Sequence, residues 1–153
     1  MMQAVIYTDG ACIGSGGGTP GGFAAIIRTG EEERIVTGRC SAATSTAMEL
    51  MGVIAALEAL VPGLPAAIHT DSRYVITGAT ERLPWWRSRR WRIVKGGKVA
   101  NRDLWQRLSD LIEDRAVTWH WVRGHAGDPL NERAHALAFG EASRARDERP
   151  KGD

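Results

Sequence analysis

The order in which strand-like and helix-like segments follow one another restricts the fold of this chain more than any other feature of its sequence. Three short β-rich segments come first, at residues 4–8, 23–28 and 33–39. A Gly-rich loop over residues 14–22 and a turn at residues 29–30 separate them. Because short connections join antiparallel neighbours, the three segments are expected to form an antiparallel meander.

The hydrophobic period then changes from that of a strand to that of a helix. Between Thr46 and Leu60, apolar residues recur at intervals of three and four. Thr46 and Glu49 have the spacing of a capping box, and Pro62-Gly63 ends the segment. The later elements are expected to be a strand at 66–70, a helix opened by Asp71-Ser72, a helix with its apolar face at 104–112, a strand at 117–122 and a helix from Asn131 to about Ala145.

This order predicts one α/β domain, with helices packed on a mixed sheet. At 153 residues the chain is long enough to bury a core of its own, and no internal repeat or linker divides it. The sequence from Arg144 onward is charged and has no apolar period. We therefore expect a domain over residues 1–145 and a charged, flexible tail over residues 146–153.

The composition indicates the class of protein and where it works. Apolar residues make up 43% of the chain and charged residues 25%, which is the balance of a soluble globular protein. No stretch approaches eighteen consecutive apolar residues, and the first residues lack a signal pattern, so a cytoplasmic location is expected. Cys12 and Cys40 are too few for a disulfide framework and lack metal-site spacing, so both are expected to be free thiols.

Positive charge is concentrated in one segment. Residues 82–102 contain eight of the twenty Lys and Arg residues and no acid, whereas the rest of the chain carries 12 basic and 18 acidic residues. A solvated helix face usually mixes both signs. The segment instead favours a polyanion such as nucleic acid, held at one place on the surface.

Three acidic residues stand where expected elements begin or end. Asp9 follows the first strand, Asp71 follows the fourth, and Glu49 lies in the first turn of the long helix. If the fold brings them together, their mutual repulsion calls for a divalent cation, and hard oxygen ligands favour Mg²⁺ or Mn²⁺. Each also has a simpler interpretation: a turn at Asp9 with the glycine after it, a helix cap at Asp71, and half of a capping box at Glu49.

The sequence around these acids resembles the type 1 ribonuclease H family over about residues 3–145. The resemblance rests on the following stretches, which have the family's order and spacing: Tyr7-Thr8-Asp9-Gly10-Ala11-Cys12, Gly21-Gly22-Phe23, Thr46-Ala47-Met48-Glu49-Leu50, Thr70-Asp71-Ser72-Arg73-Tyr74-Val75, Trp85-Trp86, Asn101-Arg102-Asp103-Leu104-Trp105 and Trp121-Val122-Arg123-Gly124-His125-Ala126-Gly127. It implies a ribonuclease H-like α/β fold with a mixed five-stranded sheet, in which strands 1–3 are the antiparallel meander and strands 4–5 are parallel.

The family cuts the RNA strand of RNA/DNA hybrids endonucleolytically, with two divalent ions, and leaves 5′-phosphate and 3′-hydroxyl ends. By position, the resemblance implies that Asp9, Glu49 and Asp71 bind the two metals. It also implies that His125, on a Gly-flanked loop, assists proton transfer or product departure. The expected partner is the hybrid duplex, recognised by its shape and 2′-hydroxyls, and the chain is expected to act as a monomer without an obligate protein partner.

The resemblance also implies where the hybrid lies. The basic segment is similar to the family's basic protrusion, with Trp86 placed to pack on a DNA sugar and arginines placed to contact phosphates. Thr44 and Asn101 fall where the family holds a DNA-strand phosphate. The full set of expected substrate contacts is Cys12, Thr44, Ser45, Arg73, Trp86, Arg87, Arg89, Arg90, Trp91 and Asn101. Amides common in the family are replaced by Ser45, Thr46 and Arg73. Four tryptophans are expected to lie mainly in the core: Trp91, Trp105, Trp119 and Trp121.

One position departs from the family's pattern at the expected metal site. A fourth acid should lie ten residues after His125, and this chain has His135 there. The site thereby loses a negative charge, and imidazole suits Mn²⁺ better than Mg²⁺, so a preference for Mn²⁺ is expected. Three roles of His135 stay open: metal ligand, neighbour of the metal through a water, or spectator. Glu132 is on the same helical face and is a candidate substitute carboxylate.

Two other functions compete with a hybrid-cutting nuclease. The missing fourth acid suggests a non-catalytic hybrid-binding module, but a dead site has no reason to keep the repulsive cluster of Asp9, Glu49 and Asp71. A nuclease of the same fold that acts on DNA is the other. The basic, Trp-containing segment and the Gly-His-Ala-Gly loop favour the hybrid as substrate over DNA.

Overall fold

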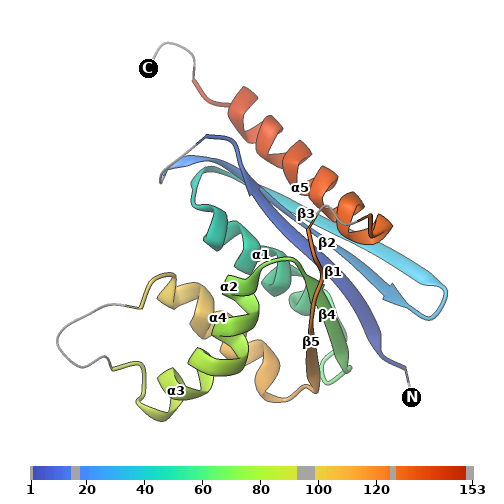
Figure 1. The fold of residues 1–153 in the computed structure, drawn as a ribbon, viewed down its shortest axis with the longest axis vertical. Helices are drawn as coiled ribbons and strands as arrows, with labels where there is room; N and C mark the ends of the chain where they lie inside the picture. The colour runs from blue at the N-terminus through green and yellow to red at the C-terminus, as the bar shows by residue number, and fades with distance from the viewer. Residues whose placement is uncertain (1, 15–17, 93–98, 125–126, 151–153) are drawn as a thin grey trace.

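The computed structural model describes residues 2–14, 18–92, 99–124 and 127–150, and it contains one five-stranded sheet (Figure 1). The strands are β1 (Ala4–Cys12), β2 (Thr19–Thr29), β3 (Glu32–Ala43), β4 (Ala66–Thr70) and β5 (Val117–Trp121). The helices are α1 (Ser45–Glu58), α2 (Arg73–Thr77), the π-helical turn η1 (Gly78–Arg82), α3 (Leu83–Ser88), α4 (Arg102–Glu113) and α5 (Pro129–Asp147). No helix in these described ranges is long and apolar enough to span a membrane.

The sheet is mixed, as the resemblance predicts. Its strand order is β3-β2-β1-β4-β5; β1, β2 and β3 pair antiparallel, whereas β4 pairs parallel with both β1 and β5. The parallel connections need crossovers, and α1 and the α2–α4 region supply them. The predicted α/β fold class is therefore confirmed.

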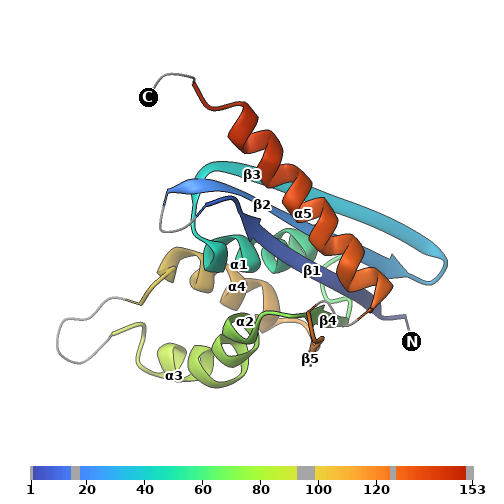
Figure 2. The ribbon, with the colours of Figure 1, turned by 45° about the horizontal axis from the view of Figure 1, so that its top comes forward.

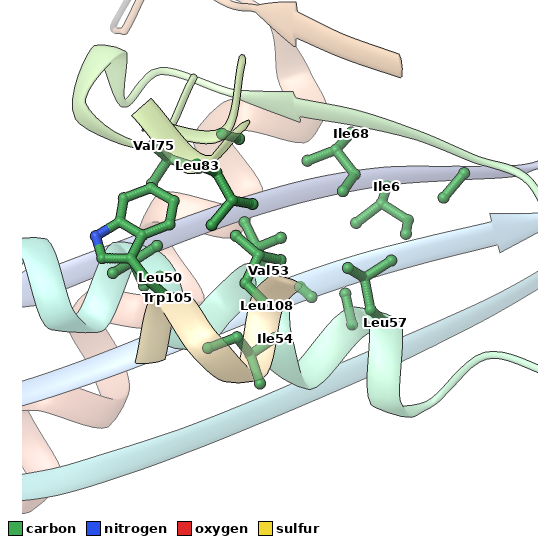
Figure 3. Packing of buried hydrophobic residues seen from close by; sticks show 14 of the residues in the cluster. Ile6, Leu50, Val53, Ile54, Leu57, Ile68, Val75, Leu83, Trp105 and Leu108 are labelled. Carbon is green, nitrogen blue, oxygen red and sulfur yellow. The ribbon is translucent and has the colours of Figure 1, made fainter. Parts of the chain in front are cut away.

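Helices cover the two faces of the sheet unequally. On one face α1 packs against β1 and β2, and α4 packs on α1. On the other face α5 crosses β1, β2 and β3, as the turned view in Figure 2 shows. The main core lies on the α1 side, where Ile6 and Ile68 from the sheet meet Leu50 and Leu57 from α1, with Trp105 of α4 buried beside them (Figure 3).

The first two strands are longer than the sequence predicts. The expected turn at Asp9-Gly10 is wrong, because β1 continues through these residues to Cys12 and pairs there with β2. The expected loop over residues 14–22 is wrong in its second half, since β2 begins at Thr19. Gly22 serves close packing instead: a Cβ there would lie 2.4 Å from the Ala138 carbonyl oxygen of α5. Glycines that indicate a loop in the sequence are here required by helix–sheet contact.

The caps of two helices also differ from the expected ones. Thr44, not Thr46, caps α1, and its hydroxyl accepts a hydrogen bond from the Ala47 amide at 3.2 Å. The capping box with Glu49 is therefore wrong. At α2 the cap is Ser72, whose hydroxyl accepts from the Val75 amide at 3.1 Å, so Asp71 is not needed as a cap.

The last helix extends beyond the expected end. It begins at Pro129, with Asp128 as its N-cap, and runs to Asp147, so residues 146 and 147 of the expected flexible tail are helical. Two ion pairs join this helix to the sheet: Arg39 of β3 binds Glu141, whose side chain is only 6% exposed, and also Glu148. These ion pairs form only when β3 and α5 are both folded and lie side by side. A charged segment without an apolar period does not indicate them. Residues 151–153 of the expected tail lie outside the described residues.

Candidate active site

Asp9 and Asp71 lie at the same edge of the sheet because of the register between β1 and β4. The parallel pairing of these strands ends with the partners Tyr7 and His69. Asp9 lies two residues beyond Tyr7, and Asp71 two residues beyond His69, so both acids leave the paired region at matching positions. Asp9 is paired with Ala24 on its other side and is only 4% exposed.

Glu49 reaches this edge because α1 lies unusually close to β1. A Cβ on Gly10 would lie 2.4 Å from the Glu49 backbone nitrogen and 2.4 Å from the Met48 carbonyl carbon. Only glycine allows this approach, and it stands directly after Asp9. The sequence neighbour of one acid thus sets the position of the second.

The three carboxylates affect one another electrostatically. Burial raises the pKa of Asp9, and the charge of Asp71 raises it further, whereas hydrogen bonds from His135 and Gly10 act in the opposite direction. Burial also raises the pKa of Glu49, the hydrogen bond from Ser72 lowers it, and the charges of Asp9 and Asp71 raise it. The fold therefore concentrates negative charge at one edge of the sheet.

The donor chemistry of this edge suits a hard divalent cation. Three carboxylates supply oxygen ligands, and a cation would offset both the burial and the mutual repulsion that raise the pKa of Asp9 and Glu49. Among the residues that the structure describes, no three His, Cys, Asp or Glu side chains already form a group that could hold a metal ion.

His135 contacts one of these acids directly. Its Nδ1 lies 2.9 Å from Asp9 Oδ2, so the residue that replaces the family's fourth acid does reach the site. Glu132 is exposed one turn earlier on α5. His125 lies outside the described residues, but the loop before it passes the site: a Cβ on Gly124 would lie 3.0 Å from Asp71 Oδ2.

Ser72 is a residue of the site that sequence reasoning assigned only to a helix. Its buried hydroxyl donates to Glu49 Oε2 at 2.6 Å while it accepts from the Val75 amide. It therefore links the α2 cap to the Glu49 carboxylate. Its position directly after Asp71 is the feature of the sequence from which a place in the site could have been predicted.

Replacing Ser72 by Ala is expected to lower both stability and activity. Loss of the cap should reduce the free energy of unfolding by about 1 kcal/mol. Loss of the bond to Glu49 should lower the expected hybrid-cleaving activity by roughly tenfold, the lower end for a residue that hydrogen-bonds to an expected metal ligand. Urea unfolding and initial cleavage rates measure the two effects. Ser72→Thr keeps the hydroxyl and should retain most of both properties; an equally impaired Thr variant would contradict the assignment.

The two residues expected to hold a DNA phosphate are joined by a small hydrogen-bond network. The Asn101 side-chain amide donates to Thr46 Oγ1 at 3.1 Å and to the Tyr74 hydroxyl at 3.0 Å. Thr44 Oγ1 lies 3.4 Å from Thr46 Oγ1. Asn101 adopts a left-handed conformation with φ 58°, which asparagine tolerates better than most residues. The structure thus brings Thr44 and Asn101 to one place, through Thr46 and Tyr74.

Several side chains of the basic segment contact the rest of the protein. Trp86 packs on Trp91 and Trp105, with ring centroids 5.8 and 5.5 Å apart, and lines a pocket of about 240 Å³ together with Arg73 and Arg82. Two of the arginines expected to bind phosphates already contact other side chains. Arg87 forms an ion pair with Glu113 at 3.8 Å, and the Arg89 guanidinium lies 4.1 Å from the centre of the Trp85 ring. Arg90 adopts a left-handed conformation. Lys95 and Lys98 lie outside the described residues.

The remaining expected substrate contacts and core tryptophans have different surroundings. Arg73 places its guanidinium 4.0 Å from the centre of the Trp121 ring. Trp121 is 44% exposed, so its expected place in the core is wrong, whereas Trp105 is fully buried and that expectation is confirmed. Trp91 and Trp119 pack against the core and are half-buried. Cys12 is half-buried, and Ser45 is exposed as the first residue of α1.

Comparison with known proteins agrees with this arrangement. The model of the family described as RNase H matches residues 1–143. Ribonuclease H of Acidovorax sp. (strain JS42) is 49% identical over 90% of this chain and 93% of its own length. Ribonuclease H of Xanthomonas oryzae pv. oryzae (strain MAFF 311018) is 42% identical over 97% of this chain and 98% of its own.

A solved structure gives the same result. The crystal structure of LC9-RNase H1, a type 1 RNase H with the type 2 active-site motif, superposes with a TM-score of 0.85. It is 32% identical, over 94% of this chain and 73% of that one. The fold is thus that of a nuclease with the ribonuclease H-like architecture. The chain belongs to the ribonuclease H family, which confirms the resemblance and the expected enzyme class.

Proposed function

We propose that this protein is an endonuclease that hydrolyses the RNA strand of RNA/DNA hybrids by a two-metal-ion mechanism and leaves 5′-phosphate and 3′-hydroxyl ends. The observation that carries the proposal is the gathering of Asp9, Glu49 and Asp71 at one sheet edge, where burial first and the charge of a neighbouring acid second raise the pKa of Asp9 and of Glu49. Family membership supports the substrate class.

Asp9, Glu49 and Asp71 are the residues that would hold the ions, and His135 lies beside Asp9. When bound, Mg²⁺ or Mn²⁺ supplies positive charge that activates water and stabilises the leaving oxygen of the phosphodiester. The protein holds the carboxylates in place: Gly10 and His135 hydrogen-bond to Asp9, and Ser72 hydrogen-bonds to Glu49. By resemblance, His125 assists proton transfer or product departure.

The hybrid is proposed to lie from this edge toward the basic segment. Thr44 and Asn101 would hold a DNA-strand phosphate, since the network through Thr46 places them together. Trp86 would pack on a DNA sugar near Arg73, with which it shares a pocket. Contacts to phosphates and sugars give affinity without base preference. A monomer provides all of these groups.

The deciding experiment compares cleavage of labelled RNA/DNA hybrid, duplex RNA and duplex DNA with Mg²⁺, with Mn²⁺ and with chelator. Cutting of the RNA strand of the hybrid alone, dependent on the metal, is the expected result. Binding of the hybrid without cleavage under any of these conditions would favour the binding module. Duplex DNA cut as fast as the hybrid would favour a nuclease that acts on DNA.

Turnover is expected to be faster with Mn²⁺ than with Mg²⁺. The site has one negative charge fewer than the family's pattern, and Mg²⁺ gives up its water reluctantly, so the loss of a charged ligand should affect Mg²⁺ more. Initial rates over a range of each metal concentration test this preference, and equal or faster turnover with Mg²⁺ would contradict it.

A further inference from the structure

Both oxygens of the Asp9 carboxylate are held by hydrogen bonds from different parts of the fold. The Gly10 amide donates to Oδ1 at 2.8 Å, and His135 Nδ1 lies 2.9 Å from Oδ2. The first partner comes from the same strand, and the second comes from α5, 126 residues along the chain. Together these two bonds fix the carboxylate plane at the sheet edge.

The position of the His135 ring is itself well determined. Asp9 is 4% exposed whereas the His135 side chain is 43% exposed, so the imidazole covers a buried acid from the solvent side. One turn further along α5, the Phe139 ring stacks on the imidazole, with centroids 6.5 Å apart and planes 28° apart. Gly22 allows α5 to approach the sheet closely enough for this contact.

Hydrogen-bond chemistry limits what Nδ1 can do in this arrangement. An ionised carboxylate can only accept, so Nδ1 carries the hydrogen when Asp9 is charged. A ring nitrogen that carries a hydrogen has no free lone pair with which to coordinate an ion. Each carboxylate oxygen has two lone pairs, so each oxygen of Asp9 keeps one for a cation after accepting its bond.

We propose that His135 is a positioning residue: it holds Asp9 through its Nδ1–H group and does not replace the family's fourth acid as a ligand. Ring N–H groups that bond to ligating groups in this way orient them, and their loss typically lowers metal affinity or activity by roughly 10- to 100-fold. The inference rests on the proposed function, because it assumes that Asp9 binds the metal.

Two amide variants separate the proposal from direct ligation. His135→Asn places an amide nitrogen near the position of Nδ1, whereas His135→Gln places one near Nε2. Mn²⁺ binding, measured by isothermal titration calorimetry and by electron paramagnetic resonance of free Mn²⁺, is the main readout. We expect His135→Ala and His135→Gln to weaken Mn²⁺ binding by about 10-fold or more and His135→Asn to bind nearly as the wild type does.

His120→Asn is the matched control, since it makes the same change at an exposed histidine of β5, and it should leave Mn²⁺ binding unchanged. Unchanged binding in His135→Ala would overturn the proposal. It would also be overturned if His135→Asn were as weak as His135→Ala, or if His135→Gln alone kept the affinity. Urea unfolding identifies any variant that fails to fold. Phe139→Leu then tests whether Phe139 orients the His135 ring. Weaker Mn²⁺ binding is the expected result, and unchanged Mn²⁺ binding would contradict this role of Phe139.

This test is independent of the substrate. If wild-type protein binds Mn²⁺ but does not cut the hybrid, the proposed function fails while the comparison of His135 variants still stands. If the wild type cuts the hybrid and the variants bind Mn²⁺ equally, the positioning role fails alone.

Discussion

Replacement of Asp9 by Asn is expected to lower the rate of hybrid cleavage by about a thousandfold or more, because metal-assisted charge stabilisation is worth several kcal/mol and each 1.36 kcal/mol is a factor of ten. The amide keeps the size of the side chain and removes the charge that would hold the cation. Single-turnover cleavage with saturating Mn²⁺ measures the effect. A variant within about tenfold of the wild type would exclude Asp9 from the metal site.

The same variant should fold at least as well as the wild type when metal is chelated. Burial and Asp71 raise the pKa of Asp9, so the folded protein binds this proton more tightly than the unfolded chain does. The stability of metal-free wild type should therefore fall as the pH rises from the ordinary carboxyl range through the raised pKa of Asp9. Asp9→Asn should show a smaller fall in urea unfolding at matched pH values. A steeper fall in the variant would contradict the pKa direction.

Replacement of Gly10 by Ala is the second change with a large expected effect. The added Cβ would lie 2.4 Å from backbone atoms of Met48 and Glu49, so α1 must move away from β1. Overpacking of this kind lowers the free energy of unfolding by about 1–3 kcal/mol. Because the shift separates Glu49 from Asp9, cleavage should also fall by roughly 100-fold, as expected for a misplacement of about 1 Å at a catalytic site.

Gly140→Ala is the matched control for this substitution. Gly140 lies inside α5, and a Cβ there would meet nothing within 4 Å among the described residues. The control should leave activity unchanged and stabilise the protein by up to about 1 kcal/mol, since Ala favours the helix. If Gly10→Ala were as active and as stable as this control, the close approach of α1 to β1 would not position Glu49.

Several elements could be predicted because their signals are local. The strand at residues 66–70 agrees with β4 residue for residue, since an apolar run flanked by Pro65 and Asp71 leaves little freedom. The helix from Thr46 agrees with α1 to within two residues at each end. The full length of the first two strands could not be predicted, because glycines such as Gly10 and Gly22 are typical of turns. Only the helices that pack against these two glycines explain why they stand in strands.

At the candidate site, the residue types and their order could be predicted from the sequence: three acids, a histidine in place of a fourth acid, and a basic segment. The sequence could not determine which partners hold them. Only the tertiary structure shows that Ser72 donates a hydrogen bond to Glu49, that Arg73 lies over the exposed ring of Trp121, and that His135 hydrogen-bonds to Asp9. The physical reason is that register, helix approach and hydrogen-bond geometry depend on contacts between segments far apart in the chain, whereas motifs and periodicity report only on neighbours.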